Sequence, residues 1–188
     1  MREIETKYRV GDLGALLAAL REAGVEVGEA VLQDDQAYAP AGWEPGMPKA
    51  GRTFCRLRTQ GSLHVFTTKT PLANTMECTE FESVVSDREQ MHAAVLQMGY
   101  VPSVRIVKHR RVGSAGQILV CVDMVEHAGA FLELEMTVDD DRDGPTVQED
   151  LDAWARGLGV ELQRTTHTYD TLVRTAPAAR AAFTTRGA

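Results

Sequence analysis

The sequence has little of what marks several large classes of protein. Its three cysteines, Cys55, Cys78 and Cys121, are far apart and form no CxxC pair, which is typical of reduced thiols rather than of a disulfide framework. No apolar run approaches the length of a membrane span, and the first residues begin no signal peptide. We therefore expect a cytoplasmic protein with no membrane partner.

Histidine motifs for metal binding and an excess of basic residues are also missing. The 5 histidines show neither HxH nor HExxH spacing, which argues against a zinc site. A formal net charge of -7 argues against a nucleic acid polymer as a partner, although it leaves room for a local basic pocket. What remains, at 188 residues, is a chain long enough for one domain with a sizeable core.

Three stretches carry one-sided apolar patterns that predict helices. The first follows Asp12, has leucines at i, i+3, i+4 and i+7, and ends at Gly24. The second lies between Asp87 and Gly99, and the third is opened by Pro145. Aspartate before a helix and glycine after it are common capping residues, so the ends of the first two helices are well defined.

Alternating patterns and turn residues predict about eight strands, joined mostly by hairpins. They cover residues 2–10, one or two strands within 25–38, and then 53–59, 63–69, 77–86, 101–112, 117–126 and 131–138. Residues 39–51 are rich in proline and glycine and predict a loop, residues 113–116 a turn, and residues 167–173 a short strand or helix. The fold class is therefore α+β, with one antiparallel sheet that is either open or closed.

The first strand has an unusual distribution of charge. Side chains alternate along a strand, so Glu3, Glu5 and Lys7 project to one face while Ile4 and Tyr8 project to the other. Two carboxylates this close repel each other unless a cation shares the site. The charged face of this strand therefore needs an explanation.

The same arrangement recurs in later strands. A solvated sheet face would explain any single case, but a sheet closed with its charges inside would gather acids and bases in one lumen. Such a lumen suits a polyanion that chelates a hard divalent cation, because Arg and Lys bind phosphate and carboxylates bind Mg²⁺ or Mn²⁺. The recurring charged residues are Arg56, Arg58, Lys69, Glu80, Glu82, Lys108, Arg110, Asp123, Glu133 and Glu135.

These residues carry a resemblance. Glu3-x-Glu5-x-Lys7 resembles the ExExK signature of the CYTH superfamily, the triphosphate tunnel metalloenzymes, which includes thiamine triphosphatases and inorganic triphosphatases. The later charged pairs follow in the order of that family, and residues 122–133 most resemble its class IV adenylyl cyclase branch. The resemblance implies a closed eight-stranded antiparallel β-barrel over residues 1–174, with helices packed outside. Residues 175–188 are expected to form a disordered tail.

The resemblance also implies roles for the charged residues. Glu5, Glu133 and Lys7 are expected to be catalytic, with Mg²⁺ or Mn²⁺ as the cofactor, and Glu80 and Glu82 are expected to support the site. The expected metal ligands are Glu3, Glu5, Asp123, Glu133 and Glu135. The residues expected to bind the triphosphate are Lys7, Arg56, Arg58, Lys69, Lys108 and Arg110.

The function implied by the resemblance has two forms. The enzyme either hydrolyses the triphosphate of a nucleotide, of thiamine triphosphate or of tripolyphosphate, or it cyclises ATP to cyclic AMP. The alternative is a sensor that binds a nucleotide or polyphosphate without turnover. Trp43 either stacks on an organic group or anchors its loop, and Tyr169 either closes one tunnel end or only packs there. A monomer and a homodimer both agree with the sequence.

Overall fold

The computed structural model describes residues 2–72, 76–139 and 141–176. Within these ranges, none of the helices has the length and apolar character needed to cross a membrane. The strands are β1 (Arg2–Val10), β2 (Val31–Pro40), β3 (Phe54–Gln60), β4 (Leu63–Pro71), β5 (Glu77–Val85), β6 (Tyr100–Ala115), β7 (Ile118–Val125), β8 (Gly129–Val138) and β9 (Leu162–Thr165). The helices are α1 (Leu13–Glu22), α2 (Arg88–Gln97), α3 (Gly144–Gly157) and α4 (Tyr169–Thr175).

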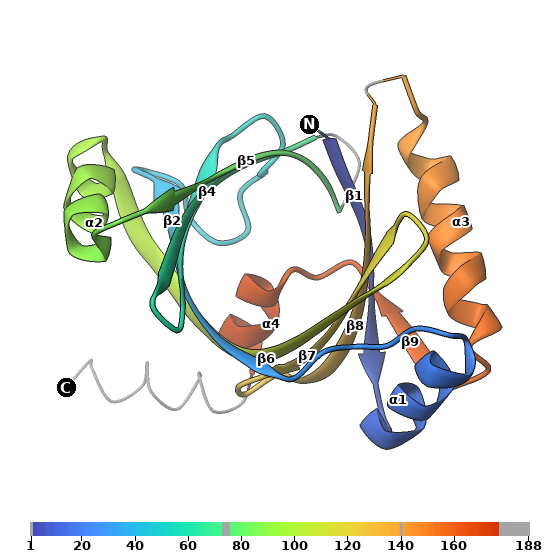
Figure 1. Cartoon of the computed structure of the whole chain (residues 1–188). Coiled ribbons are helices and arrows are strands. Elements are labelled where there is room, and N and C mark those ends of the chain that lie inside the picture. The colour runs from blue at the N-terminus through green and yellow to red at the C-terminus, as the bar shows by residue number, and fades with distance from the viewer. Residues whose placement is uncertain (1, 73–75, 140, 177–188) are drawn as a thin grey trace.

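Eight of these strands close into an antiparallel barrel, which Figure 1 shows with its opening toward the viewer. The strand order is β5-β4-β3-β2-β6-β7-β8-β1, and a further pairing of β5 with β1 completes the circle. That closing seam is short and joins residues 2–4 of β1 to residues 77–79 of β5. The rest of the same edge of β1, residues 7–10, pairs with the extra strand β9.

The main hydrophobic core lies outside the barrel. Ile4 and Tyr8 point outward from β1 and belong to one cluster with Leu16 and Leu20 of α1 and Leu151 of α3. Residues of β7 and β8 complete this cluster, so α1 and α3 cover the outer face of three adjacent strands (Figure 1). The apolar face of β1 is therefore buried by helices, and its charged face points into the barrel.

The other two helices, α2 and α4, pack against different regions of the barrel. Val95 of α2 packs with Tyr38, Cys55 and Leu57 on the outside of β2 and β3. Leu172 of α4 packs with residues of β6, β7 and β8. Helix α4 contributes to the wall of a cavity inside the barrel, as described below, so it lies across one barrel end.

The predicted closed barrel and the three predicted helices are confirmed. Asp12 and Asp87 cap α1 and α2, each by accepting a hydrogen bond from the backbone of the first turn. The predicted region 167–173 overlaps α4, and the predicted region 25–38 contains the start of a single strand, β2, which runs from Val31 to Pro40. Strand β9 was not predicted. The expected tail begins within the last turn of α4, and its residues 177–188 lie outside the described residues.

The turn predicted over residues 113–116 lies nearer the C-terminus, at residues 116–117, because β6 continues to Ala115. Gly113 serves a close approach of two backbones: a Cβ atom placed there would lie 2.6 Å from the carbonyl oxygen of Glu26. The neighbouring carbonyl of Val112 accepts a hydrogen bond from the backbone N–H of Gly28, at 3.0 Å. The glycine therefore lets residues 26–28 run along the barrel wall.

A substitution of the buried Leu151 tests whether the main core lies beneath α3, outside the barrel. Leu151→Ala removes methyl groups from a fully buried site, so we expect the free energy of unfolding in urea to fall by about 2–5 kcal/mol. Leu96 of α2 is 40% exposed and provides the control, with an expected change below about 0.5 kcal/mol for Leu96→Ala. Equal effects of the two substitutions would contradict an outer core beneath α3.

Candidate active site

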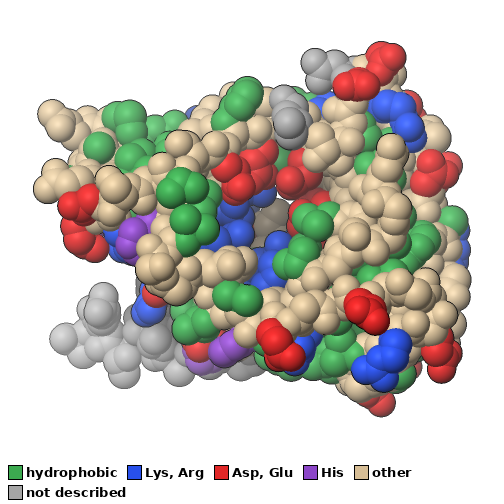
Figure 2. All heavy atoms as spheres, in the orientation of Figure 1, with side chains coloured by type: hydrophobic (Ala, Val, Ile, Leu, Met, Phe, Trp, Pro, Cys, Tyr) green, Lys and Arg blue, Asp and Glu red, His purple; other side chains and the backbone are tan. Residues whose placement is uncertain are grey.

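The charged faces of the strands form one tunnel through the barrel. A cavity of about 220 Å³ at one end and a cavity of about 790 Å³ at the other share four lining side chains, so they are two ends of one passage. The shared side chains are Arg56, Lys69, Arg110 and Glu135. All the residues that the sequence analysis selected line these cavities except Asp123, which lies behind the wall. In Figure 2 the hollow at the barrel opening shows Lys and Arg side chains inside and Asp and Glu side chains at its edge.

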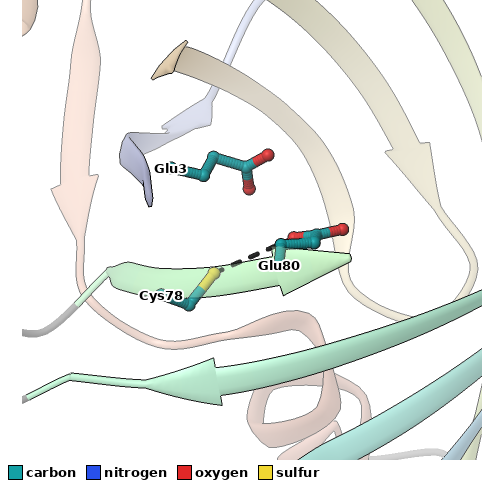
Figure 3. Close-up of side chains that lie close together, drawn as sticks. All are labelled: Glu3, Cys78 and Glu80. Carbon is teal, nitrogen blue, oxygen red and sulfur yellow. Dashed lines mark hydrogen bonds between the residues drawn. The ribbon is translucent and has the colours of Figure 1, made fainter. Parts of the chain in front are cut away.

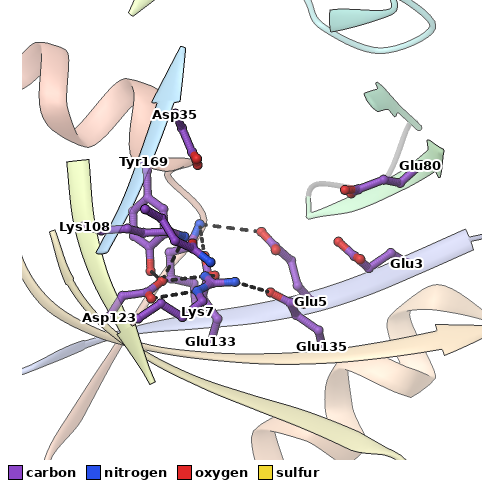
Figure 4. Close-up of polar contacts among 12 residues, drawn as sticks. Glu3, Glu5, Lys7, Asp35, Glu80, Lys108, Asp123, Glu133, Glu135 and Tyr169 are labelled. Atoms are coloured by element: carbon purple, nitrogen blue, oxygen red, sulfur yellow. Dashed lines mark hydrogen bonds and ion pairs between the residues drawn. The ribbon is translucent and has the colours of Figure 1, made fainter. Parts of the chain in front are cut away.

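Asp123 organises the most buried part of the tunnel wall (Figure 4). Its carboxylate accepts hydrogen bonds from Arg110 at 2.7 and 2.5 Å, from Lys108 at 3.2 Å and from the Tyr169 hydroxyl at 2.8 Å. The Tyr169 ring also lies 4.3 Å from Nζ of Lys7 and 4.8 Å from Nζ of Lys108. A buried charge needs such partners, and Asp123 therefore acts here as the anchor of two cations.

A second buried pair lies beside this anchor. Nζ of Lys7 is 3.0 Å from Glu133 and 3.5 Å from Glu5, and Arg110 also pairs with Glu133. Burial alone would raise the pKa of Glu133, but the Lys7 and Arg110 charges hold it well below its usual value. Burial and the nearby Arg110 charge lower the pKa of Lys108 to about 8. The tunnel wall thus holds several cations close together. The lowered pKa of Lys108 indicates that the nearby carboxylates do not fully offset burial and the repulsion between these cations.

Three carboxylates meet in the middle of the tunnel. Ligand atoms of Glu5, Glu133 and Glu135 all lie within 4.8 Å of one another, and Figure 4 shows Glu5 and Glu135 side by side. Burial and the neighbouring carboxylates Glu133 and Glu5 raise the pKa of Glu135 to about 7. Three converging oxygen donors with such repulsion fit a hard divalent cation. We call Glu5, Glu133 and Glu135 the carboxylate trio.

The wider end of the tunnel is acidic. Glu3, Cys78 and Glu80 come together there (Figure 3), and the Cys78 thiol donates to Glu80 at 3.8 Å. Nζ of Lys69 pairs with Glu80 and lies 3.7 Å from Glu3. Burial and the nearby carboxylates raise the pKa of Glu3 to about 8. A lysine ammonium thus already occupies the centre of this group, which we call the acidic mouth.

Two arginines line the tunnel between these groups. Arg56 donates to Glu82 at 2.6 Å and lies 3.4 Å from Glu80. Arg58 makes a bidentate pair with Asp35, with both hydrogen bonds at 2.7 Å. Arg58 thus binds one carboxylate through two donors, as it would bind a phosphate, whereas Arg56 contacts its carboxylates through Nη2 alone.

Sequence reasoning missed Asp35 and Thr67 and left Tyr169 open. Asp34 and Asp35 are adjacent in the chain, and β2 sends Asp34 outward to Arg105 and Asp35 inward to Arg58. Thr67 lies opposite Arg56 in the register of β3 and β4, and it accepts a hydrogen bond from that arginine at 3.0 Å. Period-two alternation was the available signal, but on β2 the apolar residues stand at adjacent positions, as in Val31 and Leu32, so they do not fix which face is inward.

Comparison with known proteins agrees with this architecture. The family model described as the CYTH domain matches residues 1–169. The chain belongs to the CYTH domain family. Adenylate cyclase CyaB from Aeromonas hydrophila is 27% identical over 172 residues, which are 90% of this chain and 87% of that protein.

Solved structures show the same fold at lower identity. The PH1012 protein from Pyrococcus horikoshii has a TM-score of 0.76 at 21% identity, with 91% of this chain and 99% of that chain covered. HpAC1 from Hippeastrum, described with a dominant triphosphatase activity, has a TM-score of 0.64 at 14% identity, with 93% and 96% covered. The predicted family and tunnel fold are thus confirmed.

The anchoring role of Asp123 can be tested by removing its charge. Asp123→Asn leaves Lys108 and Arg110 without their main buried anion, so we expect the free energy of unfolding in urea to fall by about 3–5 kcal/mol. The control is Asp34→Asn, which breaks a surface pair with Arg105 and should cost less than about 1 kcal/mol. A loss from Asp123→Asn no larger than that of the control would show that Asp123 anchors nothing.

Proposed function

We propose that this protein is a divalent-metal-dependent enzyme that acts on the triphosphate group of an organic triphosphate. The observation that carries the proposal is the carboxylate trio facing a wall of lysines and arginines inside one closed tunnel. A polyanion with a bound cation is the ligand that satisfies both sets of charges at once.

The proposed phosphate wall consists of side chains that already hold carboxylates. Arg56 and Arg58 have guanidinium forks that suit phosphate oxygens, and Lys69 supplies a point charge at the acidic mouth. The further members deeper in the tunnel are Lys7, Lys108 and Arg110. As a phosphate chain enters, its oxygens replace the carboxylates Glu80, Glu82 and Asp35 as partners of these cations.

The proposed metal ligands are the carboxylate trio, with Glu3 next to it. A bound Mg²⁺ or Mn²⁺ would neutralise phosphate oxygens and stabilise the charge that develops as a P–O bond breaks. Glu133 is shared with Lys7 and Arg110, so it also orients these two cations toward the chain. Asp123 is placed to support this group by fixing Lys108 and Arg110.

Two reactions fit this site. In hydrolysis, water attacks the terminal phosphorus, the bridging P–O bond breaks and orthophosphate leaves. In cyclisation, the ribose 3′-hydroxyl of ATP attacks the α-phosphorus, and pyrophosphate leaves. The resemblance to CyaB favours cyclisation, and the activity described for HpAC1 favours hydrolysis. A binding-only sensor is the third possibility, but it gives no reason to retain the carboxylate trio.

The first experiment is a turnover panel. ATP, GTP, thiamine triphosphate and tripolyphosphate are each supplied with Mg²⁺ or Mn²⁺, and orthophosphate, pyrophosphate and cyclic nucleotide are resolved. We expect turnover of at least one compound and its loss on chelation of the metal. Binding of these compounds without turnover would replace the enzyme by a sensor.

Glu5 is the member of the trio on which the metal assignment is best tested. Glu5→Gln removes a charged ligand while keeping the shape of the side chain, so we expect kcat to fall by about 100-fold or more, with an unchanged melting temperature. Glu29→Gln is the control, because the Glu29 side chain is 99% exposed. Full turnover by Glu5→Gln would exclude Glu5 as a metal ligand.

Metal binding should depend on pH with a definite sign. A carboxyl with a raised pKa of about 7 is protonated below that pH, so Mn²⁺ must displace a proton from Glu135 in acid. We expect Mn²⁺ affinity, measured by electron paramagnetic resonance, to fall by up to about tenfold per pH unit as the pH drops below 7. Glu135→Gln should bind more weakly and show a flatter profile. Constant affinity of the unmodified protein from about pH 6 to about pH 8 would contradict this role.

A further inference from the structure

The two ends of the tunnel differ in chemistry. The narrower end, of about 220 Å³, is lined by three aromatic residues from three separate elements of the chain. They are Trp43 of the loop after β2, Phe54 of β3 and Tyr169 of α4, whereas the Tyr38 ring lies on the outer side of β2 against His92 of α2. We call this end the aromatic compartment.

The walls of the aromatic compartment are held in place by contacts between distant segments. Trp43 meets Phe54 edge to face, with ring centroids 5.0 Å apart and an interplanar angle of 88°. Nζ of Lys49 lies 5.7 Å from each ring centroid and is bound to Asp170 at 2.8 Å. The loop that carries Trp43 is therefore tied to α4, and the compartment is a built feature of the fold.

Trp43 has an unsatisfied polar atom. The residue is 8% exposed, and its indole Nε1 has no hydrogen-bond acceptor among the described residues. A buried donor without a partner lowers stability, and native proteins rarely keep one. Because Trp43 lines the cavity, a ligand that brings its own acceptor to this wall could satisfy that donor.

The acidic mouth at the other end offers no comparable enclosure. Its apolar lining includes Phe81, Val112 and Leu119, which are all exposed, Phe81 by 64%. Glu3, Glu80 and Glu82 stand beside them. This end suits cations and the end of a phosphate chain better than it suits a flat apolar ring.

We propose that the aromatic compartment binds the organic group of the substrate, a planar heteroaromatic ring with a hydrogen-bond acceptor, as in a nucleoside triphosphate. The phosphate chain then runs from this compartment past the carboxylate trio toward the acidic mouth. The inference rests on the proposed function for the phosphate site, and it adds the class of substrate and the direction in which it lies.

Tripolyphosphate provides a matched probe, because it has the phosphate chain without the ring. In Trp43→Leu, which lacks both the ring and the donor, we expect KM for ATP to rise by about tenfold or more while KM for tripolyphosphate stays within about twofold. Trp43→Phe keeps an aromatic ring and should lie between the two. Phe81→Leu at the acidic mouth is the control, and neither KM should change.

Three results would overturn the proposal. Equal losses for ATP and tripolyphosphate in Trp43→Leu would make Trp43 a structural residue. A rise in the KM for ATP in Phe81→Leu alone would place the ring at the acidic mouth. Unchanged KM values in both variants would show that the ring of the substrate binds at neither end of the tunnel.

A binding measurement keeps the test independent of turnover. The chain has 2 tryptophans, so Trp154→Phe leaves Trp43 as the only tryptophan fluorophore. We expect ATP and GTP to change its emission in a saturable way and tripolyphosphate to leave it nearly unchanged. Saturable binding of ATP, detected by calorimetry, without any change in this emission would reject the compartment even if the phosphate site is correct. Absence of turnover together with this change in emission would reject the proposed enzyme and retain the compartment.

Discussion

Pairing of buried charges is the constraint on which the rest of the structure depends. Each lysine and arginine of the tunnel lies beside a carboxylate, as Arg58 does beside Asp35 and Lys7 beside Glu133. An unpaired charge in such a place would cost several kcal/mol, on the order of 3–5 when one partner is removed. The strands must therefore face their charges toward one another, and only a closed barrel brings all of them within reach.

The same constraint explains where the apolar side chains are. Because the interior of the barrel is filled with charge, the strands send Ile4, Tyr8 and their neighbours outward, and α1 and α3 form the core against them. It also explains why cation and triphosphate belong together in the proposed function. In that proposal the phosphate chain adds negative charge to the tunnel, and a divalent ion at the carboxylate trio would offset it.

Much of this arrangement could be predicted from the sequence because charged pairs at alternate positions identify the inward face of a strand. Helix ends were predictable from capping residues such as Asp12. What failed depends on tertiary contacts. Gly113 looked like a turn residue, but it serves the approach of the backbone at Glu26. Strand β9 is only four residues long and is defined by its pairing with β1. The partners of each charge, such as Asp35 for Arg58, emerge only from the register.

Strand β1 pairs with three other strands, with β8 along one edge and with β5 and β9 along the other. Glu3 lies opposite Cys78 of β5, and Lys7 lies opposite Thr165 of β9. The residues assigned to chemistry therefore share a backbone with the seam that closes the barrel. A substitution in this strand can therefore impair both the closure of the barrel and the binding of ligands. Its tolerance to mutation should accordingly be the lowest in the chain, and a loss of activity there is informative only beside a measurement of folding.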